Sequence, residues 1–188
     1  MNSSQVSWEA RVEDMERHLA DLRGRGYEGA VDRGDKEQVF RRAFDLTTPV
    51  AIKVLEHVDA AFLQGRGRTS VNRPEADSHG GLIASWTLTW PLLEVARDRV
   101  GGGPLPPLRL VAIFPMEWTH GHLAILTLSP GEEVACTWPF QVITEADALR
   151  QEPILWAMAE TELHERIFRA ESNWRVIPEG HEAAASSP

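Results

Sequence analysis

The chain has 188 residues, a formal net charge of -9 and a pI near 5.3. This acidic balance argues against nucleic acid as a partner, because a phosphate backbone is bound by clustered lysines and arginines. The chain has no apolar run of the ~18 residues that a membrane helix needs, and its first residues lack the basic and apolar segments of a signal peptide, so we expect no membrane partner.

The first third of the chain has the spacing of amphipathic helices. Residues 8–24 repeat apolar side chains at steps of three and four, and glycines follow. A second helix is predicted over residues 35–45 with Asp35 as its N-cap, and a third begins near Pro49 and ends before Gly65. We expect residues 1–66 to form a helical segment that packs on the rest. The apolar positions of the first helix are Trp8, Val12, Met15, Leu19 and Leu22.

The middle of the chain changes to a period of two. Residues 82–90 alternate apolar and polar side chains, which is typical of a half-buried strand, and residues 108–114, 122–129 and 134–143 predict three more. The turn signal at residues 129–133 predicts a hairpin between the last two strands. Pro139 then places the last strand at a sheet edge or a bulge. The Gly-rich stretch at residues 65–73 is predicted to be a loop.

A helix is predicted from Ile154 to about Ala170, and the tail at residues 176–188 is too small and polar to pack. The order of elements predicts an α+β fold: N-terminal helices, an antiparallel sheet of about four strands and a long C-terminal helix packing on the sheet. Residues 67–175 would form the core of a single domain. The uncovered face of the sheet would form a ligand pocket or the interface of a homodimer.

Two histidines flank a glycine where the third strand begins. In an extended backbone, His120 and His122 share one face a few ångströms apart, which suits two ligands of a Zn²⁺ or Fe²⁺ ion. A third ligand would come from Glu117, His79 or Asp77. A cupin-like metal site also begins with His-x-His, but it needs a glutamate a few residues later, and residues 123–128 hold no carboxylate. The candidate cofactor is therefore a divalent metal ion outside that family.

Other residues supply candidate catalytic and binding groups. His79 and Glu117 are the candidate acid and base, because imidazole and a tuned carboxylate both transfer protons near neutral pH. Trp86, Trp118 and Trp138 lie on or beside predicted strands and are the candidate substrate-binding residues, although large apolar side chains on strands are more often core.

The stretch "DSHGGLIASW" at residues 77–86 resembles the hotdog-fold thioesterases, in which a similar histidine and glycines precede a central helix. The resemblance implies thioesterase activity around His79, and it covers about a dozen residues. The sequence departs from the family because the residues after Gly81 alternate like a strand and no catalytic carboxylate follows at the usual place.

Several enzyme classes lack their motifs here. The chain has no phosphate-binding loop, dinucleotide-binding glycine pattern or serine nucleophile elbow. The single cysteine, Cys136, suits a reducing cytoplasm and is predicted to be a small buried hydrophobe. We therefore expect a small cytoplasmic enzyme or ligand-binding domain that acts on a small organic molecule, aromatic or acyl, by acid/base or metal-assisted chemistry. The alternative is a non-catalytic interaction or homodimerisation domain.

Overall fold

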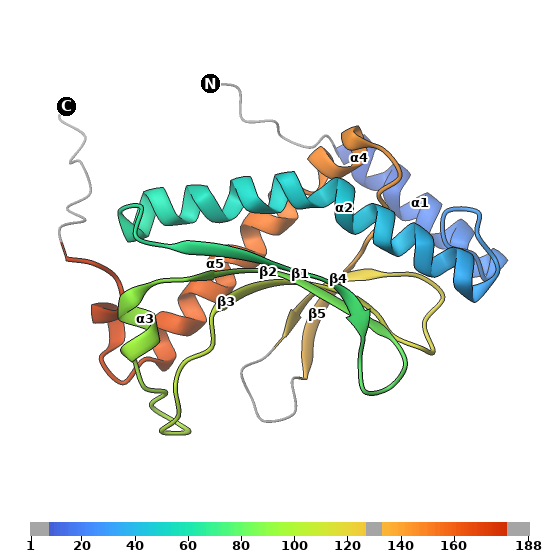
Figure 1. Cartoon of the computed structure of the whole chain (residues 1–188). Helices are drawn as coiled ribbons and strands as arrows, with labels where there is room; N and C mark the ends of the chain where they lie inside the picture. The colour runs from blue at the N-terminus through green and yellow to red at the C-terminus, as the bar shows by residue number, and fades with distance from the viewer. Residues whose placement is uncertain (1–7, 127–132, 180–188) are drawn as a thin grey trace, which may run out of the picture.

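The computed structural model describes residues 8–126 and 133–179 and has the α+β architecture that the sequence predicts (Figure 1). Two long helices, α2 and α5, cover one face of an antiparallel sheet. No helix among the described residues is long and apolar enough to cross a membrane. The elements in chain order are α1 (Trp8–Gly24), α2 (Arg33–Val58), the π-helical turn η1 (Asp59–Leu63), β1 (Arg68–Ala76), β2 (Leu82–Thr89), α3 (Pro91–Val95), β3 (Leu108–Phe114), β4 (His122–Leu126), β5 (Val134–Pro139), α4 (Glu145–Arg150), α5 (Glu152–Arg169) and the 3-10 turn η2 (Asn173–Val176).

The sheet has five strands in the order β1-β2-β3-β4-β5, each antiparallel to its neighbour. The predicted hairpin partners β4 and β5 do pair, and β5, which holds Pro139, is an edge strand as expected. The turn predicted at residues 129–133 lies largely outside the described residues. In the described part of the chain, β1 is the strand that the sequence did not predict. It was predicted as a loop because it lies at an edge with most of its side chains exposed, which leaves no apolar alternation.

Helix α2 replaces the two helices that the sequence predicts over residues 35–64. Asp32 caps it through a 2.8 Å hydrogen bond from Gly34 N–H, and Pro49 lies inside it. A proline removes one helical hydrogen bond, but buried residues on both sides of Pro49 hold α2 on the sheet. Phe44, for example, stacks on Trp86 of β2 with ring centroids 4.5 Å apart. Tertiary packing therefore outweighs the local break.

Helix α1 exposes its apolar side to solvent and turns its polar side inward. Met15 is 51% exposed and Leu19 41% exposed, although the periodicity suggested that they face the core. On the inward side Arg17 pairs with Glu28 at 2.6 Å, and Asp21 accepts a 3.3 Å hydrogen bond from Gln141. The polar face of α1 therefore lies against the body of the protein, and both sites described below use it.

Candidate metal centre

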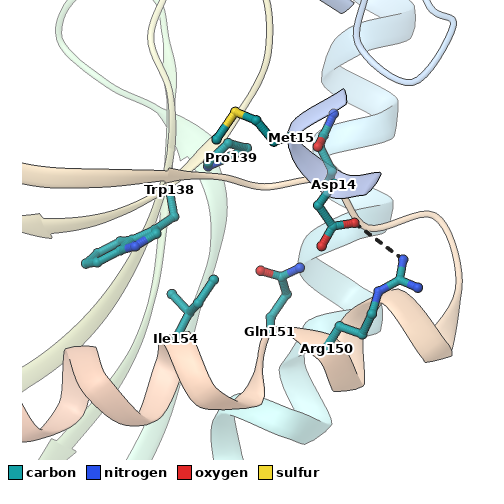
Figure 2. Close-up of a pocket in the computed structure, with 8 residues that line it drawn as sticks. Asp14, Met15, Trp138, Pro139, Arg150, Gln151 and Ile154 are labelled. Atoms are coloured by element: carbon teal, nitrogen blue, oxygen red, sulfur yellow. Dashed lines mark ion pairs between the residues drawn. The ribbon is translucent and has the colours of Figure 1, made fainter. Parts of the chain in front are cut away.

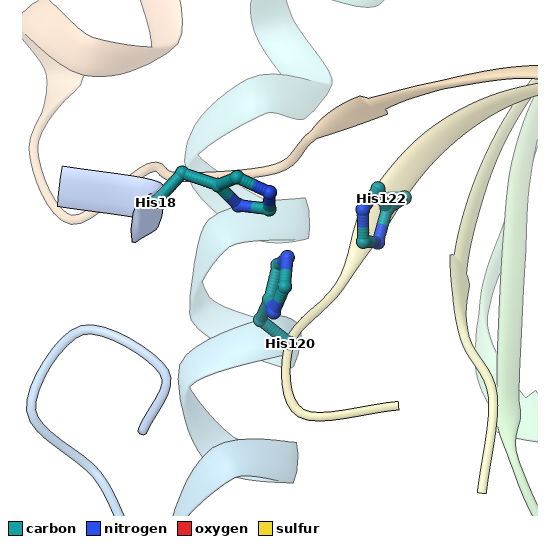
Figure 3. Close-up of side chains that lie close together, drawn as sticks. All are labelled: His18, His120 and His122. Atoms are coloured by element: carbon teal, nitrogen blue, oxygen red, sulfur yellow. The ribbon is translucent and has the colours of Figure 1, made fainter. Parts of the chain in front are cut away.

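Three histidines from separate parts of the chain converge beside the start of β4. His18 comes from the polar side of α1, His120 from the connection between β3 and β4, and His122 is the first residue of β4 (Figure 3). The ring centroids of His120 and His122 lie 4.6 Å apart, and that of His18 lies 4.3 Å from His120 and 5.9 Å from His122. One nitrogen from each ring lies within 4.8 Å of the other two. We call these three residues the histidine cluster.

The glycine between the two neighbouring histidines lets this segment approach the core closely. A Cβ atom at Gly121 would lie 2.6 Å from Cδ2 of Phe40 and 3.1 Å from the Tyr27 hydroxyl. The Gly121 carbonyl accepts a 3.0 Å hydrogen bond from Phe140 N–H, and the Tyr27 hydroxyl donates to the Phe140 carbonyl at 2.6 Å. His120 and His122 are thus carried by a backbone held from both sides.

Each ring of the cluster keeps one buried nitrogen without a hydrogen-bond partner in the protein. These atoms are Nδ1 of His18, Nε2 of His120 and Nδ1 of His122. The other nitrogen of His120, Nδ1, lies 2.7 Å from the Thr119 hydroxyl, which orients that ring. Buried polar atoms in folded proteins are nearly always paired. Three neighbouring imidazoles that each keep one buried nitrogen unpaired therefore point to an external partner.

The surroundings keep the three imidazoles neutral at physiological pH. Burial lowers the pKa of His120 to about 4, and the neighbouring His18 and Lys36 act in the same direction. Burial and repulsion from His120 and His18 also lower the pKa of His122 to about 4. The pKa of His18 is lowered by burial, although Asp21 opposes the shift. Neutral imidazole is the form that binds metal ions.

No family model, curated protein or solved structure matches the chain. The all-nitrogen donor set of the histidine cluster suits zinc, copper, nickel or iron rather than magnesium or calcium, which prefer oxygen ligands. The cluster holds no carboxylate, so it is not the two-histidine, one-carboxylate triad of many iron enzymes.

The structure places the candidate third ligands and catalytic residues outside this cluster. The grouping that the described residues offer to a metal contains His18 in place of Glu117, His79 or Asp77. His79 and Glu117 are both exposed, and His79 lies in the turn between β1 and β2, where its N–H donates to Asp77 at 2.8 Å. The strand β2 begins at Leu82, where the hotdog resemblance implies a helix.

The three candidate tryptophans lie in three different environments. Trp118 is beside the histidine cluster, with its ring edge-to-face to His122 at 4.5 Å and with 37% of its surface exposed. Trp86 is fully buried in the core, where its indole N–H donates to the Thr48 hydroxyl at 2.9 Å. Trp138 lines a separate cavity (Figure 2). The prediction for Cys136 is wrong, because this residue is exposed on the edge strand β5.

His18 is the member of the cluster that the sequence did not reveal. It lies more than a hundred residues from His120, and only the packing of α1 beside the start of β4 brings the two together. The available signal was a histidine among the charged positions of an amphipathic helix, which is usually solvent-exposed. His18 is instead turned towards the protein, because the polar face of α1 packs inward.

Proposed function

We propose that this protein binds one divalent transition-metal ion through His18, His120 and His122, and that this ion is zinc. The observation that carries the proposal is the convergence of three histidines that each offer one ring nitrogen within 4.8 Å of the others, with one buried nitrogen of each ring unpaired. Zinc binds histidine nitrogen at 2.0–2.1 Å, so tetrahedral ligands lie about 3.3 Å apart. The nitrogens therefore need to close by at most about 1.5 Å, which side-chain rotation can supply.

The proposed chemistry is the hydrolysis or hydration of a small molecule. A zinc ion with three protein ligands keeps a fourth position for water and lowers the pKa of that water to about 7. Trp118 borders the cluster and remains partly exposed, so it is the residue best placed to contact an organic substrate there. We expect the protein to work in the reducing cytoplasm, since its single cysteine is exposed and unpaired.

Metal binding is tested by titrating the EDTA-treated chain with zinc in competition with a chromophoric chelator. We expect one zinc ion per chain and a loss of affinity of at least about 100-fold in His18→Gln, His120→Gln and His122→Gln, because each removes one ligand. His79→Gln is the matched control, since that histidine is exposed and lies outside the cluster. If all four variants bound zinc like the wild type, the histidine cluster would not be the metal site.

Catalysis is tested separately with a chromogenic acetate ester. We expect the zinc-loaded chain to release the alcohol faster than the metal-free chain or the His122→Gln variant does. Equal rates for the three samples would remove the hydrolytic part of the proposal and leave metal binding intact.

A second candidate function is homodimerisation through α1. Four exposed apolar side chains follow the 3-4-3 spacing of a coiled-coil seam, which a second copy of the same helix can match. They are Val12, Met15, Leu19 and Leu22. The mass of the chain in solution, measured by light scattering at several concentrations, distinguishes a dimer from a monomer. A monomer at all concentrations would remove this candidate.

A further inference from the structure

A cavity of about 130 Å³ lies between α1, the end of β5 and the start of α5 (Figure 2). Trp138, Met15 and Ile154 supply apolar walls, and Asp14, Gln141, Arg150 and Gln151 supply polar groups. We call it the Trp138 cavity. It shares no residue with the histidine cluster, although Asp14 precedes His18 by one helical turn and Pro139, which also lines it, is the cross-strand partner of His122.

Three polar atoms of this lining are buried without a hydrogen-bond partner in the protein: Oε1 of Gln141, Oε1 of Gln151 and Nε of Arg150. Gln141 is 1% exposed and Gln151 is 3% exposed, so neither can turn its amide freely to bulk solvent. Leaving a buried donor or acceptor unpaired is costly, and folded proteins rarely do so. All three residues line this one cavity, which is therefore the space from which a bound molecule can pair with them.

The charges at the cavity offset one another. Arg150 lies 3.5 Å from Asp14 and forms a second ion pair with Asp147. Burial raises the pKa of Asp14, which Arg150 and Arg17 partly counteract. A strongly charged ligand would find no free counter-charge in this arrangement. The cavity therefore favours a neutral molecule.

We propose that the Trp138 cavity binds a neutral, planar aromatic compound with N–H donors and one acceptor along an edge, such as an amino- or lactam-substituted heterocycle. The two amide oxygens would accept from the N–H donors, and Arg150 Nε would donate to the acceptor. The aromatic body would lie against Trp138 and Ile154, since aromatic rings prefer such surroundings. This site is independent of the proposed metal centre.

The probe is 2-aminoquinazolin-4-one, which is neutral and has two kinds of N–H donor and a carbonyl. Quinoxaline, which has a similar shape and only acceptors, is the control compound. Binding is measured by titration followed in the backbone and indole resonances of the labelled full chain. We expect saturable binding of the probe with shifts at the Trp138 indole, and binding of quinoxaline at least tenfold weaker.

Substitutions then test the two glutamines. Gln141→Met and Gln151→Met keep the side-chain length and remove the unpaired oxygen, so each should weaken probe binding about tenfold or more. The thermal midpoint of the free chain checks that both variants fold. Gln38→Met, at an exposed position on α2, is the matched control and should bind the probe like the wild type.

Two outcomes would overturn the proposal. The first is the absence of saturable probe binding, which would mean that the cavity holds only ordered water. The second is equal affinity in Gln141→Met, Gln151→Met and Gln38→Met, which would place the probe elsewhere. Zinc removal should leave probe affinity unchanged, so a failure of the metal proposal and a failure of this one can be told apart.

Discussion

Gly121 offers the sharpest test of how the histidine cluster is positioned. In Gly121→Ala, the new methyl group would meet Cδ2 of Phe40 at 2.6 Å, Cε2 of Phe40 at 3.1 Å and the Tyr27 hydroxyl at 3.1 Å. Both Phe40 and Tyr27 are fully buried, so neither ring can move into open space. The backbone that carries the two neighbouring histidines must move instead.

The magnitude follows from the cost of inserting one methyl group into a packed core. We expect Gly121→Ala to lower the free energy of unfolding by about 1 to 3 kcal/mol. For a chain of this size, that corresponds to a fall of about 2 to 12 °C in the thermal midpoint. Zinc affinity should fall as well, because His120 and His122 move with the displaced segment while His18 on α1 stays.

Three further variants show whether the loss arises from this contact. Gly103→Ala is the matched control, since a Cβ atom there meets no atom within 4 Å. Phe40→Leu makes room for the methyl group, so the double variant should lose less stability than the sum of the two single changes, with a coupling of at least about 0.5 kcal/mol. Thermal unfolding and zinc titration of the wild type and the four variants measure both effects. Wild-type stability and zinc affinity in Gly121→Ala would refute the reasoning.

The remaining predictions concern the metal, the pH and the exposed side of α1. Zinc at 100 times its dissociation constant should raise the free energy of unfolding by about 2.7 kcal/mol, or the thermal midpoint by about 5 to 11 °C. At the same zinc concentration, His18→Gln should reduce this rise to about 0.4 kcal/mol or less. Between pH 7 and pH 5 with EDTA present, His120 and His122 should each lower the stability by about 2 kcal/mol, because the unfolded rings take up protons near pH 6.5 and the folded ones near pH 4. Urea unfolding of His122→Gln should show a shallower loss towards acid, and an unchanged loss would contradict the assignment. Leu19→Glu should convert the proposed dimer to a monomer in light scattering with little change in thermal midpoint, since Leu19 is 41% exposed; a dimer of unchanged mass would place the interface elsewhere.

The elements that could be predicted from the sequence are those that bury one side, because this burial produces a regular spacing of apolar residues. Strand β2 alternates cleanly because Trp86 and Leu88 face a helix-covered core. Strand β1 gave no such signal because it is an edge strand whose side chains are largely exposed, and its identity depends on pairing with β2. Local periodicity indicates which side chains a segment buries. It does not reveal a strand that is held mainly by backbone hydrogen bonds.

The same limit applies to the histidine cluster. The His-x-His spacing was enough to predict that His120 and His122 lie close together, although His120 precedes the strand, which begins at His122. The choice of a third ligand depended on contacts between distant segments, and residues near in sequence such as Glu117 lie exposed instead. No periodicity in α1 indicates that its polar side packs inward. The sequence alone therefore could not identify His18 as the third member of the cluster.

The orientation of α1 connects the two proposed sites. A helix that served only stability would bury Met15 and Leu19, since apolar burial yields about 25 cal/mol for each Å² removed from water. This helix instead places His18 against two other histidines and Asp14 in the lining of the Trp138 cavity. Departures from ordinary patterning are expected where a protein binds something. The inward polar side of α1 is thus accounted for by the two proposed sites, and its exposed apolar side by the proposed homodimer interface.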